Sequence, residues 1–454
     1  MNRTEYLESL TEQIRNRHAK ELVLKEITAH IEDQKEAYLL EGKGEAEAEE
    51  LAVREMGNPV DAGARLDKIH RPKTDIWMFG AMVILTLIGI IMQSIICSGF
   101  DNSRVSSDYC SRTILFNLIG LCVMLFVYFA DYRILGEHIW KLCGIYLIGS
   151  MFALHAPMYG SYSSYLILGQ TVCFLFVPLF AAICYRFREQ KAKGILKAFG
   201  ILLLTVFLWL LAGYYVSAAM LLSFAACLFT LCAAAFRGVF GGRKELQGGV
   251  LLSLIIGVPA LLLGDVLLFH GRFLFLAEYQ IRRIQVMFAP SLYPDSVSYQ
   301  TMLIRDQLSE ASLLGGGAVG AIGEMAGAWC DYVLICLTSY FGLLVGIAVV
   351  AVIAAFFVRS LHISFMQSNR LGFLLGVACS SILILKTVIY VAMNFGVGPV
   401  IGIDMPFLTY GLHCTVLNFL FMGIILSVYR NTNLLPELKN TPRYRLKFEK
   451  VNPQ

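Results

Sequence analysis

The sequence predicts an all-α, polytopic membrane protein with about ten transmembrane helices and a small N-terminal cytoplasmic helical domain. Of its 454 residues, 57% are hydrophobic and 15% are charged, an apolar share well above that of a soluble domain. The apolar residues also lie in blocks of about twenty, the length of helix that crosses a bilayer. The net charge of +4 is too small to favour a nucleic-acid partner.

Residues 1–75 are predicted to form the N-terminal helical domain. Apolar residues recur at helical spacing in EYLESLTEQIRNR and ELVLKEITAHIEDQKEAYLL, with charges on the other face. EAEAEELAVREM is a third such segment, which GNP ends, and VDAGARLDKI is a fourth. The stretch has no apolar core or cleavage site and is therefore not a secretory signal. A docking or regulatory module and a folding aid both fit this composition.

Ten apolar segments follow in residues 76–430, each near the length that a bilayer requires. The predicted spans are 76–97, 113–130, 138–155, 164–185, 195–212, 214–236, 248–269, 332–358, 372–396 and 407–429. Basic residues concentrate at 186–194, at 236–245 and in the tail 431–454, whereas 156–163 and 212–214 carry no Lys or Arg. Because short basic loops stay in the cytoplasm, we expect both termini there.

The outer loop at 270–330 is far longer than an ordinary connection, which favours a functional role. It contains an amphipathic, aromatic stretch and then LLGGGAVGAIG, whose glycines allow backbone to approach a ligand closely. Asp331 follows, at the entrance to the eighth apolar segment. Two interpretations of Asp331 stay open from the residues alone. It is a helix N-cap, for which aspartate is well suited, or it is the residue that carries the chemistry of the protein.

Two charged residues lie inside predicted spans. Lys386 falls well within 372–396, and Asp265 falls in the outer half of 248–269. A charge buried in lipid is costly, so both are candidates for function.

The segment before the last span resembles the SEDS family (shape, elongation, division and sporulation proteins). NFGVGPVIGIDMPFLTYG is similar to the family's run G-x-x-P-V-x-G-I-x-x-P-F-x-S-Y-G, with Thr409 in place of the serine. The matching residues are Gly396, Pro399, Val400, Gly402, Ile403, Pro406, Phe407, Tyr410 and Gly411. In the outer loop, RRIQVMFAPSLYPDSVSYQ and GGGAVG resemble two further family segments. The resemblance spans about residues 76–430.

This resemblance implies a peptidoglycan glycosyltransferase that polymerises lipid II at the outer face of the bacterial cytoplasmic membrane, in division, elongation or sporulation. It places Asp331 at the family's catalytic aspartate. The expected substrate-binding residues are Arg283, Gln300, Gly316, Gly317, Thr409, Tyr410 and Lys386. It also implies a class B penicillin-binding protein as partner. A divalent cation, Mg²⁺ or Mn²⁺, would suit the pyrophosphate, although no cluster of metal ligands is evident.

The sequence also departs from the family pattern. QTVCFLF at 170–176 keeps Gln170 of the motif Q-P-S-E-x-x-K but lacks its charged residues, and Ser339 and Tyr340 stand where the family has two glutamates. We predict that Lys386 replaces the missing lysine and pairs with Asp331 or Asp265. The alternatives are a purely structural pair with Asp265, or a lysine that reaches the membrane surface. A catalytically impaired scaffold or precursor binder, and a lipid flippase or transporter, remain the alternative functions.

Overall fold

The computed structural model describes residues 1–15, 17–69, 71–98, 109–155, 162–211, 218–243, 298–319, 327–398 and 400–432. Short pieces are also described at 247–249, 251–253, 256–257, 281–282, 285–286 and 321. Every regular element in these residues is a helix, and eight helices are long and apolar enough to cross a membrane. The predicted fold class, an all-α polytopic membrane protein, is therefore confirmed.

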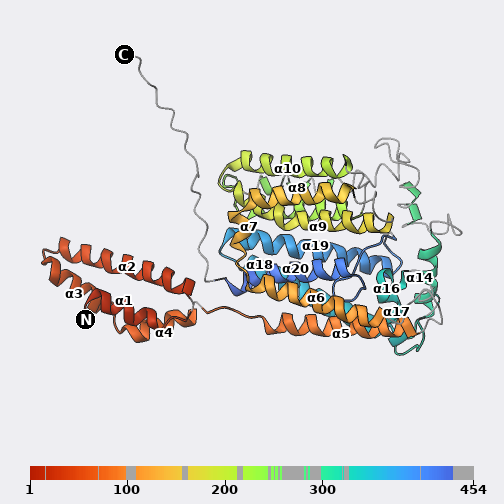
Figure 1. Cartoon of the computed structure of the whole chain (residues 1–454), viewed down its shortest axis with the longest axis horizontal. Coiled ribbons are helices and arrows are strands. Elements are labelled where there is room, and N and C mark those ends of the chain that lie inside the picture. Colours follow the sequence, from red (N-terminus) through yellow and green to blue (C-terminus); the bar gives the residue numbers. More distant parts are fainter. Residues whose placement is uncertain are drawn as a thin grey trace, which may run out of the picture.

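The first four helices pack into a group of their own at one end of the molecule (Figure 1). They are α1 (Arg3–Glu12), α2 (Arg17–Leu40), α3 (Glu45–Glu55) and α4 (Pro59–Ile69). Tyr6, Leu10 and Val23 are buried between them. The helices carry many charges on their outer faces because these faces contact water.

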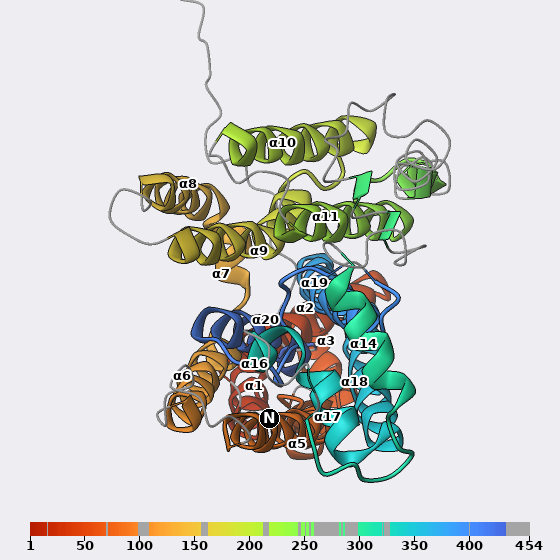
Figure 2. The same cartoon turned by 90° about the vertical axis from the view of Figure 1, so that its right-hand side faces the viewer.

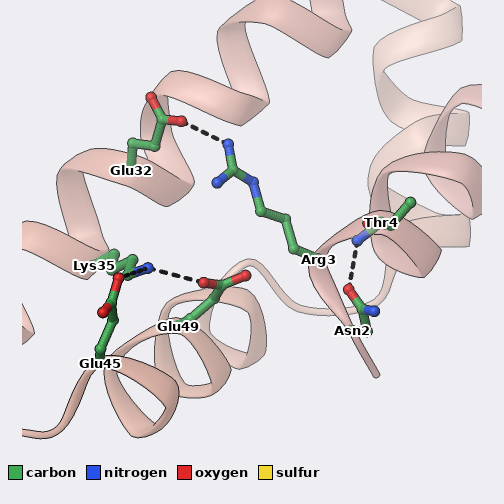
Figure 3. A network of polar contacts seen from close by, with 7 residues as sticks. All are labelled: Asn2, Arg3, Thr4, Glu32, Lys35, Glu45 and Glu49. Carbon is green, nitrogen blue, oxygen red and sulfur yellow. Dashed lines mark hydrogen bonds and ion pairs between the residues drawn. The ribbon is translucent and has the colours of Figure 1, made fainter.

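Ion pairs tie the first three helices together at the surface (Figure 3). Arg3 lies 2.7 Å from Glu32, and Lys35 lies 3.2 Å from Glu45 and 2.9 Å from Glu49. Side chains on three different helices are thus joined across their exposed edges.

The membrane helices form the larger part of the molecule (Figure 1). They are α5 (Ile76–Ser98), α6 (Tyr109–Phe129), α8 (Ile139–His155), α9 (Tyr162–Arg186), α10 (Lys191–Leu211), α11 (Ala218–Phe236), α18 (Leu343–Phe365), α19 (Arg370–Asn394) and α20 (Leu412–Arg430). A short helix, α7 (Arg133–Glu137), precedes α8. The apolar part of α8 covers only Ile139–Met151. Helices α9, α11, α19 and α20 are mostly buried, whereas α6 and α10 present large apolar side chains outward, as a lipid-facing rim would.

The segment that precedes α5 meets the last turn of α20 at the end of the bundle that faces α1–α4. The N–H of Lys73 donates to the carbonyl of Arg430 at 3.2 Å, and Thr74 lies 3.1 Å from the hydroxyl of Tyr128. Asp75 pairs with Arg359 of α18 at 2.8 Å. The chain therefore enters and leaves the bundle at the same end, next to the N-terminal helices.

The predicted span 332–358 is wrong in its boundaries. Two helices replace it: α17 (Val333–Phe341), which is buried, and then α18. Gly342 separates them with a φ of 99°, and a Cβ there would lie 2.6 Å from the carbonyl oxygen of Leu313. A residue with a side chain would thus be strained and crowded at this turn. The predicted span 248–269 lies mostly outside the described residues.

Of the long outer loop, the described residues include α14 (Tyr299–Ser309), the segment 311–319 and the single-turn helix α16 (Ala328–Asp331). Together with α17 they lie at the end of the bundle opposite α1–α4 (Figure 2). This end carries the candidate site.

Candidate active site

Asp331 is the last residue of α16 and does not cap a helix. The turn is closed by the N–H groups of Cys330 and Asp331, which both donate to the carbonyl of Gly327 at 2.8 Å. Tyr332 is the N-cap of α17, and no side chain caps that helix. The interpretation of Asp331 as an N-cap is therefore wrong, and its carboxylate is available for another role.

Two residues of α19 hold the backbone on both sides of Asp331. Asn394 donates from Nδ2 to the carbonyl of Asp331 at 3.0 Å and accepts from the N–H of Ile335 at 3.1 Å. The hydroxyl of Tyr390 accepts from Val333 and donates to Cys330. These contacts satisfy backbone groups that the break between α16 and α17 leaves without helical partners. Asp331 is thus fixed in place by a spanning helix.

The carboxylate of Asp331 is largely shielded from water and makes no hydrogen bond or ion pair within the described part of the chain. Burial, together with the negative charge of Asp404, raises the pKa of Asp331 to about 6. Oδ1 would lie 3.9 Å from a Cβ built on Gly402. An aspartate with a pKa close to neutral can both take and release a proton at physiological pH, which is what a general base requires.

Residues 395–411, which carry the family-like motif, connect α19 to α20 and pass next to Asp331. The carbonyl of Gly402 accepts from Nε2 of Gln170 on α9 at 3.3 Å. The glutamine that sequence reasoning aligned with the family motif on α9 therefore reaches the second motif directly. The two segments lie more than 200 residues apart in the chain and meet only through the fold.

Lys386 is fully buried, and its partner is not the predicted one. Nζ lies 2.7 Å from Oδ2 of Asp404 and 3.0 Å from Oδ1 of Asn418. Among the residues that the structure describes, Lys386 forms no ion pair with Asp331, and Asp265 lies outside them. The pairing of Lys386 with Asp331 was therefore wrong. With an exposed fraction of 0%, Lys386 does not reach a substrate in this conformation.

Tyr410 lies against the turn that carries Asp331. Its N–H donates to the carbonyl of Trp329 at 3.2 Å, and its ring lies 4.5 Å from that of Tyr109. Gln93 of α5 donates to the same Trp329 carbonyl at 2.7 Å. Thr409 is buried, and its hydroxyl donates to the carbonyl of Met405. Tyr410 is thus placed near the site, whereas the hydroxyl of Thr409 is used inside the protein.

The predicted binding residues Gly316 and Gly317 contact the end of α17 that is farther from Asp331. The N–H groups of Gly316 and Gly317 both donate to the carbonyl of Tyr340 at 3.0 Å, at the far end of α17. The nine residues of α17 span about 13 Å at 1.5 Å per residue, so this end is one helix length from the end next to Asp331. These glycines therefore allow close approach to the protein's own backbone. Gln300 lies in α14, and Arg283 lies outside the described residues.

Sequence reasoning missed three residues of the site. Asp404 is one, although a carboxylate in the apolar stretch 397–411 was a visible signal. Asn394 and Gln93 are the others, and neither could be recognised because each acts on a backbone carbonyl distant in sequence. In the described residues, no group of three His, Cys, Asp or Glu side chains is arranged to hold a metal ion.

Comparison with known proteins gives consistent results. A probable peptidoglycan glycosyltransferase FtsW of Bacillus subtilis is 22% identical over 214 residues, which are 46% of this chain and 50% of that protein. A protein of the same description from Trichlorobacter lovleyi is 22% identical over 170 residues, 35% of this chain and 43% of its own length. The chain thus matches half or less of these relatives.

Solved structures show the same fold. A chain from a study of polymerization and crosslinking by a peptidoglycan synthase complex superposes with a TM-score of 0.59 at 15% identity, over 79% of this chain and 98% of that one. A mutant of the rod shape determining protein RodA of Thermus thermophilus gives 0.50 at 13% identity, with the same coverage. The model of the FtsW, RodA and SpoVE family, described as cell cycle proteins, matches residues 74–434. The chain therefore belongs to this family.

Proposed function

We propose that this protein is a peptidoglycan glycosyltransferase that polymerises lipid II. The observation that carries the proposal is Asp331, a shielded carboxylate with a pKa of about 6 at the end of the bundle opposite the N-terminal helices. Its position in a chain of the FtsW, RodA and SpoVE family supports it, as does the description of the relatives as peptidoglycan glycosyltransferases.

In the proposed reaction, a sugar hydroxyl of one lipid-linked disaccharide attacks the anomeric carbon of another. Asp331 takes the proton of that hydroxyl as the new glycosidic bond forms. The bond from the anomeric carbon to the pyrophosphate breaks, and undecaprenyl pyrophosphate leaves with the electron pair. A divalent cation, Mg²⁺ or Mn²⁺, would suit the oxygens of the pyrophosphate and balance the charge that develops on it.

We further propose that the reaction takes place at the outer face of the bacterial cytoplasmic membrane, with both termini in the cytoplasm. The meeting of Lys73 and Arg430 at one end of the bundle supports termini on the same side. A class B penicillin-binding protein is the proposed partner, because it would crosslink the strands that this chain makes. The similar chain from a peptidoglycan synthase complex supports such an assembly.

A precursor-binding protein without catalysis is the second candidate. The observation that favours it is Ser339, which stands where the family has a glutamate. Its hydroxyl accepts a hydrogen bond from Gln307 of α14 at 2.6 Å, so a contact within the protein has taken the place of a carboxylate.

The test is polymerisation of lipid II by the purified full-length chain in liposomes, with and without the penicillin-binding protein and with Mg²⁺ or Mn²⁺. We expect Asp331→Asn to lower the rate by at least about 100-fold, the usual contribution of a general base. Asp306→Asn is the matched control, because Asp306 is an exposed carboxylate of α14 at the same end of the molecule. Full activity of Asp331→Asn, or no glycan strands from the wild type in any condition, would overturn the proposal.

The pH profile provides a second prediction. A general base works only when ionised, so the rate should fall as the pH drops below the pKa of its carboxyl. Because that pKa is raised to about 6 from the ordinary 3.8, we expect the half-maximal rate near pH 6. Rates measured between pH 4.5 and 8 would check this, and a rate that stays constant down to about pH 4.5 would contradict it.

A further inference from the structure

The centre of the bundle contains a buried polar cluster next to the candidate site. Lys386 of α19, Asp404 of the α19–α20 connection and Asn418 of α20 are joined by three hydrogen bonds of 2.7, 3.0 and 2.8 Å. Their exposed fractions are 0%, 7% and 2%. Each member contacts both others, so the cluster is closed and its charges balance.

Burying this cluster costs free energy. Removing a lysine and an aspartate from water costs more free energy than apolar side chains of the same volume would. Nζ of Lys386 already donates to Asp404 and Asn418 and lies 4.8 Å from the ring centre of Phe174 on α9. The ammonium group therefore has partners on three separate parts of the chain, all of them protein.

The cluster is close to Asp331 through the backbone. Asp404 is two residues from Gly402, the residue that approaches the Asp331 carboxylate. Gln170 holds the carbonyl of Gly402 from α9, one helical turn before Phe174. The segment beside Asp331 is thus fixed on one side by Gln170 and on the other by the ion pair.

The cluster also places a negative charge, that of Asp404, beside Asp331. Burial alone would raise the pKa of Asp404, but the charge of Lys386 and the hydrogen bonds of Lys386 and Asn418 hold it below its ordinary value. Asp404 is therefore ionised, and its charge contributes to the raised pKa of Asp331.

Two other titratable groups lie beside Asp331, Cys330 and Tyr332, and burial raises the pKa of both. Tyr390 of α19 uses its hydroxyl to bond the backbone of Val333 and Cys330, and His413 of α20 lies near Asp404. Asp404 is thus the described charge that acts on Asp331.

We propose that Lys386 and Asp404 are positioning residues that fix the Gly402 segment against Asp331 and keep a negative charge beside its carboxylate. The importance of these residues for catalysis rests on the proposed function. Their effect on the Asp331 carboxyl can be measured without any enzymatic activity.

The experiment titrates Asp331 in the full-length protein by infrared difference spectroscopy. The carboxyl band of Asp331 is identified by its loss in Asp331→Asn. In Asp404→Asn the neighbouring negative charge is absent, and we expect the pKa of Asp331 to fall by about one unit. In Lys386→Met, Asp404 loses its counter-charge and takes up a proton, so we expect a fall of similar size.

Three further variants sharpen the result. The double variant Lys386→Met/Asp404→Asn should shift the titration no further than either single change, because both act through one charge. Lys386→Arg keeps the charge and should restore a pKa of about 6. Thr387→Val is the matched control: this buried neighbour on α19 has a hydroxyl with no partner among the described residues, so its removal should leave the titration unchanged.

An Asp331 titration that is unchanged or moves upward in Asp404→Asn would overturn the inference. Asp404→Asn nearly preserves shape and so keeps the test decisive if Lys386→Met does not fold. Rates with lipid II would be measured on the same samples, and the acid limb should move with the infrared pKa. If the wild type makes no glycan while the infrared shifts occur, the proposed function fails and the positioning role stands.

Discussion

The ion pairs of the N-terminal helices and the Lys386–Asp404 pair in the bundle centre differ in their surroundings. Lys35 holds two carboxylates, Glu45 and Glu49, at an edge where Glu45 is 82% exposed. Lys386 holds one, Asp404, where both side chains are shielded from water. Distances are similar in the two places, between 2.7 and 3.2 Å.

Geometry alone therefore does not determine how much an ion pair contributes to stability. Water and salt screen the charges at the surface, so a pair there contributes little and its loss costs little. In the bundle, side chains replace water around Lys386 and Asp404, so each buried charge is stabilised mainly by the other. The N-terminal charges therefore mainly keep the surface of these helices soluble. The central pair, by contrast, contributes to the stability of the membrane bundle.

The largest effect is expected from breaking the central pair. Lys386→Met removes the counter-charge of Asp404, whose buried carboxyl must then take up a proton, and should lower the free energy of unfolding by about 3–5 kcal/mol. The measurement is thermal unfolding of the protein in detergent. Lys386→Met/Asp404→Leu should recover much of the loss, since no buried acid without a partner remains. A double variant less stable than the single one would contradict this account.

An intermediate effect is expected at Asp75, where the N-terminal helices join the bundle. Its carboxylate accepts from the N–H of Met78 at the start of α5 and pairs with Arg359 at 2.8 Å. Asp75→Asn should cost about 1–2 kcal/mol by the same measurement, because it weakens a helix cap and an ion pair. Arg359→Met removes only the ion pair and should cost less. The reverse order would show that the cap is unimportant.

The smallest effect is expected at Lys35. Lys35→Met breaks both exposed pairs and should leave the unfolding midpoint of the N-terminal helices without measurable change, in low or high salt. Leu10→Ala is the control that shows the assay detects these helices. Leu10 is fully buried, and its truncation should cost about 2–5 kcal/mol. A clear loss in Lys35→Met would mean that surface pairs contribute as the central one does.

The fold could be predicted from the sequence wherever a long apolar run decided it. Residues 372–396 were predicted as a span, and α19 covers Arg370–Asn394. Prediction failed where a single glycine redirected the chain. Gly342 breaks the apolar run 332–358 because the loop carrying Leu313 packs against it, and the sequence does not show that contact. Gly411 likewise delays the start of α20 to Leu412.

The candidate site was predictable only in part. Asp331 was visible because a carboxylate stood at the edge of an apolar run, and Lys386 because it stood inside one. Their relation was not visible. Asp404 lies at a variable position of the family-like motif, so attention to the motif's fixed residues passed over it. Asn394 acts through its amide on a backbone carbonyl 63 residues away, and no local pattern reports such a contact.

The hydrogen bond between Lys73 and Arg430 brings together two points near the limits of the region that matches the family, residues 74–434. A domain attached before Lys73 or after Arg430 would lie at the same end of the bundle, and the bundle helices would keep their positions. A circular permutant that joins these two points by a short linker and opens another connection should therefore keep the bundle intact.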